Sequence, residues 1–165
     1  MKMLIIDTSQ KIGLVALYQK PTGFKTITFD SQHQQKILIS SIDSLIKGVN
    51  INCIAICIGP GSFTGTRIGV ITAKALSYAK NISLHPFHSL LPYHTPNTLT
   101  LLNAKNDHAF TFDGTHLNKV PYTAFSSFPL YSPHPETFPF PVNQAHYQLE
   151  SLLTLAPEPS LQLIY

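Results

Sequence analysis

The chain has 165 residues, of which 44% are hydrophobic and 12% charged, and its formal net charge is +3 at pH 7. This length suits one domain, or two small lobes that share a core. The apolar fraction is typical of a globular protein with much buried or partner-covered surface. No apolar run is long enough for a membrane-spanning helix, and the strand-like start containing Asp7 argues against a secretory leader. We therefore expect a cytoplasmic protein without a membrane partner.

The charges are unevenly distributed along the chain. Residues 1–119 hold all eleven Lys and Arg with five acids, whereas residues 120–165 hold three Glu and no basic residue. This mildly basic first part falls short of the basic stripe typical of nucleic-acid-binding proteins. Tight RNA binding by this chain alone is therefore not expected.

The first half of the chain predicts an α/β layer architecture. Apolar residues alternate or run together as in strands, and then recur at the spacing of amphipathic helices. The order of three strands, helix, strand and helix fits such an architecture on its own merits. The predicted elements are strands at 3–8, 13–18, 24–29 and 53–58, a helix capped by Ser31 and reaching Val49, and a helix capped by Thr64 and reaching about Lys80.

Two cysteines, Cys53 and Cys57, lie four residues apart on the predicted fourth strand. Side chains at that spacing point to the same face of a strand, where two thiols alone form no metal cage. We interpret them as small buried hydrophobic residues of a reducing cytoplasm.

A glycine-rich bend joins this strand to the second helix and contains the only arginine of the chain. Such a bend lets the backbone approach a ligand or another chain closely. It is no Walker loop, because no Gly-Lys-Ser/Thr closes it, and its third glycine comes one position too late for the dinucleotide fingerprint. The motif consists of Gly59, Pro60, Gly61, Ser62, Phe63, Thr64, Gly65, Arg67 and Gly69.

Arg67 lies in the first turn of the predicted helix, where a cation opposes the helix dipole. A carboxylate or bound anion is its natural partner. An internal acid such as Asp7 and an intersubunit or ligand contact are equally compatible with the sequence.

The second half predicts a short strand at 82–84 and a hairpin of residues 98–104 and 108–112 that turns at Asn106-Asp107. Eight of the thirteen prolines lie after residue 120, interleaved with aromatic residues. Proline blocks helix interiors, whereas the aromatic residues argue against disorder. We expect residues 121–141 to form an extended strap across the first lobe, followed by a short helix at 142–155 and a last strand at 160–165.

Two motifs together resemble the TsaB (YeaZ) family: Ile5-Ile6-Asp7-Thr8-Ser9 and Gly-Pro-Gly-Ser-Phe-Thr-Gly-x-Arg-x-Gly. The resemblance is clear from Met1 to about Leu90, thinner at 101–112, and absent at 121–156. The chain is also shorter than usual members, and Asn103-Ala104-Lys105 replaces their Asp-Ala-Arg/Lys. The resemblance implies an actin-like (ASKHA, ribonuclease-H-like) α/β lobe at 1–97 and a reduced, divergent C-terminal lobe at 98–165.

The resemblance further implies a non-catalytic partner in the synthesis of N6-threonylcarbamoyladenosine in transfer RNA. Such proteins pair through their two amino-terminal helices with TsaD, which works with the ATPase TsaE, and meet tRNA only through the complex. No HxxxH pair, which holds the metal of TsaD, occurs here, and the first helix offers only His33. We expect no cofactor of the chain's own, and ATP with Mg²⁺ only within the complex. The predicted interface residues are Ile42, Ile46, Gly69, Thr72, Ala73 and Leu76.

Two alternatives stay open. In actin-like folds Asp7, Thr8 and Ser9 would lie near nucleotide phosphates, which allows a small ATP-dependent phosphotransferase or hydrolase, although these residues are also common in ordinary turns. The second helix is apolar on two sides, which suits burial within its own domain or a subunit interface. That interface is equally compatible with a degenerate relative that forms a homodimer.

Overall fold

The structure, a computed structural model, describes residues 1–30, 34–125, 129–158 and 161–164. The chain divides into two compact units, residues 1–89 together with 155–165, and residues 90–154. This differs from the expected boundary at residue 97. Leu90 is buried with Leu102 and Phe112 in the core of the second unit, so the division falls before it. The last residues return to the first unit instead of completing the second.

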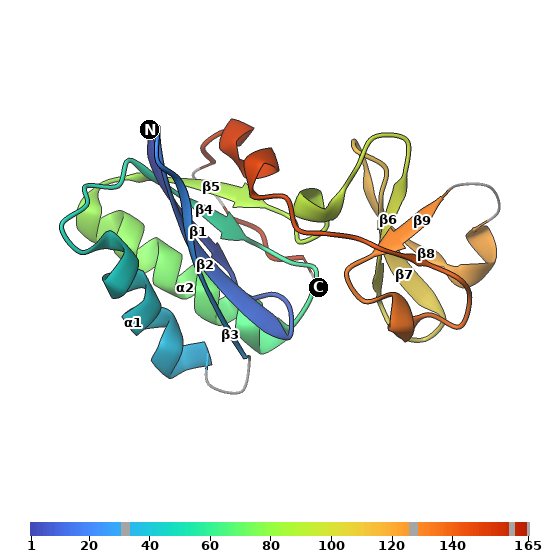
Figure 1. Cartoon of the computed structure of the whole chain (residues 1–165). Coiled ribbons are helices and arrows are strands. Elements are labelled where there is room, and N and C mark those ends of the chain that lie inside the picture. Colours follow the sequence, from blue (N-terminus) through green and yellow to red (C-terminus); the bar gives the residue numbers. More distant parts are fainter. Residues whose placement is uncertain (31–33, 126–128, 159–160, 165) are drawn as a thin grey trace. The chain divides into compact units, whose positions relative to one another are not determined.

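The first unit is built on a five-stranded sheet of β1 (Lys2–Asp7), β2 (Ile12–Gln19), β3 (Gly23–Asp30), β4 (Cys53–Cys57) and β5 (Ser83–Phe87). The strands lie in the order β3-β2-β1-β4-β5 (Figure 1). β2 is antiparallel to both β1 and β3, whereas β1, β4 and β5 are parallel. The predicted opening order is confirmed, and the fifth strand extends beyond the expected residues 82–84.

Two helices, α1 (Gln34–Ile46) and α2 (Phe63–Lys80), lie side by side on one face of this sheet (Figure 1). Leu38 and Ile42 of α1 and Ala73 of α2 are at most 5% exposed and belong to the same apolar core as the sheet. Both predicted helices are thus confirmed. Ser31, the expected cap of the first, lies outside the described residues.

The start of α2 is fixed by Ser62 and not by Thr64. The Ser62 hydroxyl oxygen accepts a hydrogen bond from Gly65 N at 3.1 Å, which satisfies one of the free amides of the first turn. Asn81 ends the helix in the left-handed conformation. The helix cap therefore lies two residues earlier than the sequence suggested.

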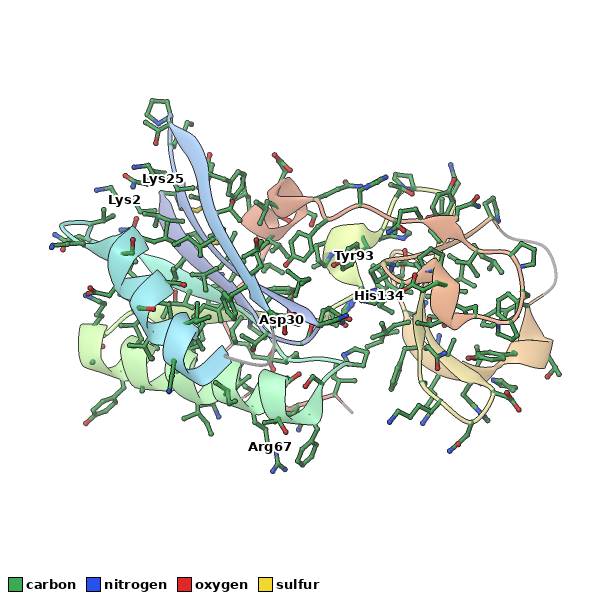
Figure 2. All side chains as sticks on the ribbon, turned by 60° about the horizontal axis from the view of Figure 1, so that its bottom comes forward. Lys2, Lys25, Asp30, Arg67, Tyr93 and His134 are labelled. Atoms are coloured by element: carbon green, nitrogen blue, oxygen red, sulfur yellow. The ribbon has the colours of Figure 1, made fainter. Side chains whose placement is uncertain are left out.

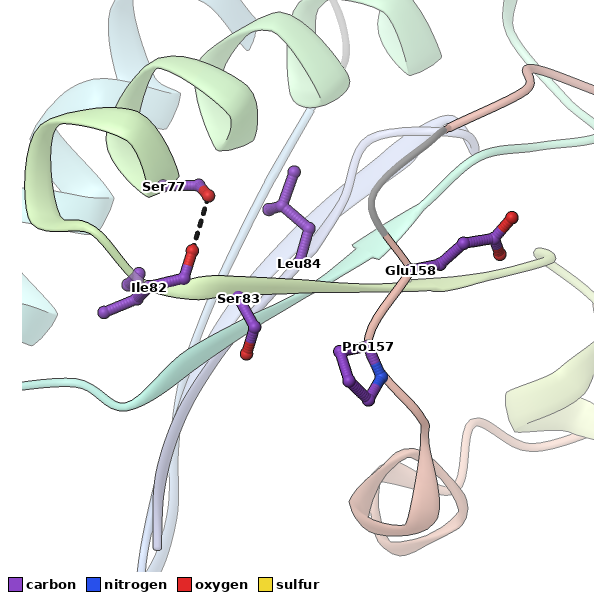
Figure 3. Close-up of a pocket in the computed structure, with 6 residues that line it drawn as sticks. All are labelled: Ser77, Ile82, Ser83, Leu84, Pro157 and Glu158. Carbon is purple, nitrogen blue, oxygen red and sulfur yellow. Dashed lines mark hydrogen bonds between the residues drawn. The ribbon is translucent and has the colours of Figure 1, made fainter.

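The last residues pack on the first unit. Leu161 and Leu163 pack against its apolar core, and Figure 3 shows Pro157 and Glu158 beside Ser83 and Leu84 of β5. Residues 161–164 form no strand, which corrects that expectation. The segment is held by hydrogen bonds from Glu158 N to Leu84 O at 3.0 Å, from Ile164 N to Ile58 O at 2.8 Å, and between His85 Nδ1 and Leu155 O at 2.7 Å.

The second unit contains a sheet of β6 (Leu99–Asn103), β7 (His108–Phe112), β8 (Leu117–Pro121), β9 (Leu130–Ser132) and β10 (Asn143–Gln144), in the order β10-β9-β6-β7-β8. The predicted hairpin of β6 and β7 is confirmed. Lys105, Asn106 and Asp107 of its turn all have positive φ angles, a conformation that Asn and Asp tolerate best among residues with side chains.

The described part of the proline- and aromatic-rich segment, residues 121–125 and 129–141, belongs to the second unit. It forms short 3-10 turns and β9, and the rings of Tyr122, Phe125, Phe138 and Phe140 pack together with centroids 5.2–6.4 Å apart. This cluster covers Leu101 and Ala109 of the sheet. The expected strap across the first lobe is therefore wrong, because the aromatic rings build the core of their own unit.

Residues 142–155, expected as a short helix, contain β10 and a 3-10 helix at Leu149–Thr154. Among the helices of the described residues, none combines the length and apolar character needed to cross a membrane.

Candidate functional site

The glycine-rich bend packs against the turn that follows β1. Ser62 N donates a hydrogen bond to Ser9 O at 2.7 Å, and a Cβ atom at Gly61 would overlap that same carbonyl. Gly59 has a φ angle of +97° and lies against the carbonyl of Ile164. Glycine is needed at these two positions because backbone approaches backbone directly. The motif thus links the β1 turn, α2 and the C-terminal residues.

The Asp7-Thr8-Ser9 turn is buried, with exposed fractions of 3%, 0% and 1%. Thr8 Oγ1 donates to Gly65 O at 2.7 Å. Asp7 Oδ1 accepts hydrogen bonds from Ser9 N at 3.0 Å and from Ser9 Oγ at 2.7 Å. Both hydroxyl hydrogens are therefore engaged within the protein. In this structure the three residues therefore stabilise the turn after β1 by hydrogen bonds, as Asp, Thr and Ser commonly do in turns.

The two cysteines are buried and free, as expected. They alternate along β4 with Ile54 and Ile56, which belong to the core under the helices. Burial, and then the negative charge of Asp7, raise the pKa of the Cys57 thiol well above its usual range. Cys57 is thus a protonated, unreactive side chain at neutral pH.

Arg67 points outward from the start of α2 (Figure 2). Its guanidinium carbon lies 3.8 Å from the centroid of the Phe63 ring, a cation–π contact along one face of the helix. Phe63 is itself 51% exposed. An exposed aromatic ring and a cation are thus presented together, one turn apart.

The predicted interface residues divide between the two sides of the helices. Gly69 and Ala73 are buried against the sheet, and Ile42 is only 5% exposed. The expectation that Gly69 and Ala73 face a partner is corrected, because their small size serves the approach of α2 to its own sheet. Ile46, Thr72 and Leu76 are half-buried between the helices.

A groove of about 600 Å³ runs between α1 and α2 on their outer side. Two large apolar side chains that the predicted interface did not include are exposed in it: Ile39 is 58% exposed and Ile71 67%. Neither isoleucine falls at the helical spacing of the core residues of its helix. An apolar residue outside that spacing is the sequence signal that could have identified this exposed surface. The groove is lined by Ile39, Ile42, Asp43, Ile46, Lys47, Ile71, Thr72, Ala75, Leu76 and Lys80.

His85 has a local structural role. His85 bridges Ser83 Oγ at 2.9 Å and Leu155 O at 2.7 Å. No group of three or more His, Cys, Asp or Glu that could hold a metal occurs among the described residues, and His33 lies outside them. The Asn103 side-chain oxygen holds the hairpin turn by accepting a hydrogen bond from Lys105 N at 2.8 Å.

The chain resembles known proteins in sequence and in fold. The family model described as TsaD, tRNA N6-adenosine threonylcarbamoyltransferase, matches residues 20–127. The tRNA threonylcarbamoyladenosine biosynthesis protein TsaB of Bacillus subtilis is 30% identical over 96 residues, which are 54% of this chain and 42% of that protein. The matched part thus spans less than half the length of this curated relative.

Two solved structures share the fold. YeaZ from Pseudomonas aeruginosa superposes with a TM-score of 0.72 at 19% identity, covering 93% of this chain and 89% of that chain. A second, titled an uncharacterized protein with similarity to peptidase YEAZ from Pseudomonas aeruginosa, gives 0.71 at 17% identity, covering 99% and 98%. The likeness in fold therefore includes residues 121–156, where the motifs showed no match. Because the family model covers more than half of the chain and the curated relative is a TsaB, the chain belongs to the TsaB (YeaZ) branch of the tRNA N6-adenosine threonylcarbamoyltransferase family.

Proposed function

We propose that this chain is a non-catalytic, cytoplasmic subunit in the synthesis of N6-threonylcarbamoyladenosine in tRNA. It pairs with a TsaD-type catalytic subunit through α1 and α2, and it works with a TsaE-type ATPase. Contact with tRNA comes through the assembled complex. The family and the printed function of the TsaB relative support the pathway, and the apolar α1–α2 groove supports the pairing.

The groove supports pairing because it leaves branched apolar side chains in water. Ile39 of α1 and Ile71 of α2 both line it, at 58% and 67% exposure. Burying the part of each side chain that is still exposed would contribute roughly 1–2 kcal/mol. Phe63 and Arg67 continue the exposed face at the start of α2, and aromatic residues and arginine are enriched at the energetic centres of interfaces.

The β1 turn supports a non-catalytic role. Nucleotide binding in the expected position would use the Thr8 and Ser9 hydroxyls as donors to phosphate, yet they donate to Gly65 O and Asp7 Oδ1. Binding would therefore have to break two buried hydrogen bonds. A subunit that only presents a rigid helix surface to its partner can keep the Thr8 and Ser9 hydroxyls in these hydrogen bonds.

The test is co-expression with the TsaD homologue of the same organism, followed by size-exclusion chromatography with light scattering. We expect a one-to-one complex with the wild-type chain and none with Ile71→Asp, because a carboxylate would be buried in an apolar contact. Ile12→Asp is the matched control, since Ile12 is 53% exposed on β2, outside the groove. Circular dichroism checks that both variants are folded.

Two folded wild-type proteins that elute separately would contradict the pairing. A complex that survives Ile71→Asp but not Ile12→Asp would place the interface elsewhere on the first unit. A homodimer of the chain alone, lost in Ile71→Asp, would assign the same groove to self-association.

A further inference from the structure

A cavity of the second unit shares no residue with the α1–α2 groove. Its volume is about 620 Å³, within the range of small-molecule sites. It borders the sheet of β6, β7 and β8 (Figure 1), and its lining comes from these strands and from the residues that flank them. The described residues that line it lie between 97 and 125, so the cavity belongs to one compact unit.

Asp113, directly after β7, brings a fixed carboxylate to this cavity. Its Oδ1 accepts hydrogen bonds from His116 N at 2.7 Å and from Thr115 N at 2.8 Å. These two bonds lower the pKa of Asp113 below its usual range, so the group is ionised at neutral pH. Its Oδ2 lies 3.6 Å from Nδ1 of His116, which is too far for a hydrogen bond. One carboxylate oxygen is therefore left to accept a bond from a ligand.

Two threonines add hydroxyl oxygens to the same lining. Thr111 of β7 is 5% exposed, and its hydroxyl makes no hydrogen bond within the described part of the chain. Buried hydroxyls are nearly always bonded to protein, water or ligand, so this one is suited to a partner inside the cavity. The Thr98 hydroxyl donates to Thr95 O at 2.7 Å, which leaves its oxygen as an acceptor.

The rest of the lining is largely apolar and carries no fixed positive charge. Leu99 and Phe125 belong to the apolar cluster on this face of the sheet, and Val120 lines the cavity beside them. Among the described lining residues there is no Lys or Arg, and Asp113 is the one acid. An anion would thus meet a carboxylate without a compensating cation, whereas a cation would be attracted.

We propose that this cavity binds a small organic cation, which is an ammonium or amidinium group on an aromatic or aliphatic body. The head donates to Asp113 Oδ2 and to the Thr111 hydroxyl, and the body packs on the apolar part of the lining. Hydrogen bonds between charged groups are roughly twice as strong as neutral ones, so Asp113 selects the sign of the ligand. The inference goes beyond the proposed function, since it needs neither the two helices nor a partner subunit.

The experiment titrates the isotope-labelled full chain with benzylamine as the probe and follows the backbone amide shifts by NMR. Benzoate and benzyl alcohol are titrated in the same way, because they keep the aromatic ring and change the head to an anion or a neutral group. Asp113→Asn removes the charge but keeps Oδ1 for its two backbone donors. Asp107→Asn is the matched control, since Asp107 is an exposed acid of the same unit that does not line the cavity.

We expect benzylamine to shift the amides of the cavity lining and to leave those of α1 and α2 unchanged. Its Kd should rise roughly tenfold in Asp113→Asn, as for the loss of one charge-assisted hydrogen bond, and stay within about twofold in Asp107→Asn. Thr111→Val keeps the shape of the side chain without its hydroxyl and should weaken binding about threefold. Benzoate should bind at least about tenfold more weakly than benzylamine, with benzyl alcohol between them.

Three results would overturn the inference: no saturable shift at the cavity in tens of millimolar benzylamine, equal affinity for benzylamine and benzoate, or equal benzylamine binding by Asp113→Asn and wild type. If Asp113→Asn does not give the spectrum of a folded protein, Thr111→Val and the benzoate comparison on wild type decide. None of these measurements uses the TsaD homologue. Failure of this inference therefore leaves the proposed pairing intact, and failure of the pairing leaves this site intact.

Discussion

Gly69 of α2 lies directly against Thr8 of the turn after β1. A Cβ atom at position 69 would overlap the Thr8 hydroxyl oxygen, with Ile56 Cδ1 at 3.5 Å beyond it. The hydroxyl is held in place because it donates to Gly65 O at 2.7 Å. The close approach of the helix to the sheet therefore depends on the missing side chain. Gly69 serves the packing of its own unit rather than a partner.

Gly69→Ala is expected to lower the free energy of unfolding by about 1–3 kcal/mol, the usual cost of inserting a methyl group into a packed core. This is opposite in sign to the gain of about 1 kcal/mol that alanine gives over glycine in an exposed helix interior. Urea denaturation followed by circular dichroism measures the change.

The control is the same substitution in a Thr8→Ala background, where the clashing hydroxyl is absent. There Gly69→Ala should cost less, with a coupling on the order of 0.5–3 kcal/mol between the two positions. Stabilisation by Gly69→Ala alone would show that α2 does not rest on Thr8.

The first unit was predictable because its signals are local. Apolar runs and helical spacing fixed the strands and helices within a few residues, and the glycine motif marked the strand–helix bend. Which side of α2 packs on the sheet could not be read from the helix sequence itself, because it depends on residues distant in the chain. A stripe of small residues such as Gly69 and Ala73 is equally compatible with contact to another helix or to a sheet. Only the positions of Thr8 and Ile56 beside Gly69 show that this side of α2 packs on the sheet of its own unit.

The second unit was less predictable because its core is assembled from distant pieces. Tyr122 and Phe125 meet Phe138 and Phe140 through 3-10 turns and a three-residue strand, and such short elements have weak sequence patterns. The return of Leu161 and Leu163 to the first unit is also a long-range contact. The exposed Ile39 and Ile71 were left out of the predicted interface, although Ile42, Ile46, Thr72 and Leu76, which line the same groove, were included.

Cys57 is expected to resist thiol reagents in the folded protein. Burial raises its pKa well above the usual range, and the thiolate is the reactive form. With Ellman's reagent at pH 8, neither cysteine should react until urea unfolds the chain, when both should react. Rapid release of one equivalent of thionitrobenzoate from the native protein would mean that a cysteine of β4 becomes accessible by local opening and would contradict this prediction.

The same shift predicts a pH dependence of stability. Because the folded protein binds the Cys57 proton more tightly than the unfolded chain, this contribution is fully present below the unfolded pKa, about 8.5. It is lost as the pH rises above that value. In Cys57→Ala the alkaline decrease in unfolding free energy should be shallower. An equal slope in both proteins would exclude Cys57 as its source.

Saturating Mg-ATP is expected to leave the melting temperature of the isolated chain unchanged. The Thr8 and Ser9 hydroxyls already donate within the buried turn, and a ligand that does not bind the native state cannot stabilise it. Differential scanning fluorimetry with and without Mg-ATP measures this. A concentration-dependent increase that disappears in Asp7→Ala would instead support the phosphotransferase or hydrolase alternative.

The C-terminal residues are expected to stabilise the first unit through their leucines. Leu163 is half-buried against its core, whereas Gln162 beside it is exposed. Leu163→Ala should lower the unfolding free energy by roughly 1–2 kcal/mol, less than the 2–5 kcal/mol of a fully buried leucine because part of the side chain already meets water. Gln162→Ala is the matched control and should change it by less than about 0.5 kcal/mol. Equal urea midpoints for both variants would mean that residues 161–164 lie on the first unit without stabilising it. A loss confined to Leu163→Ala would show that the end of the chain completes this core.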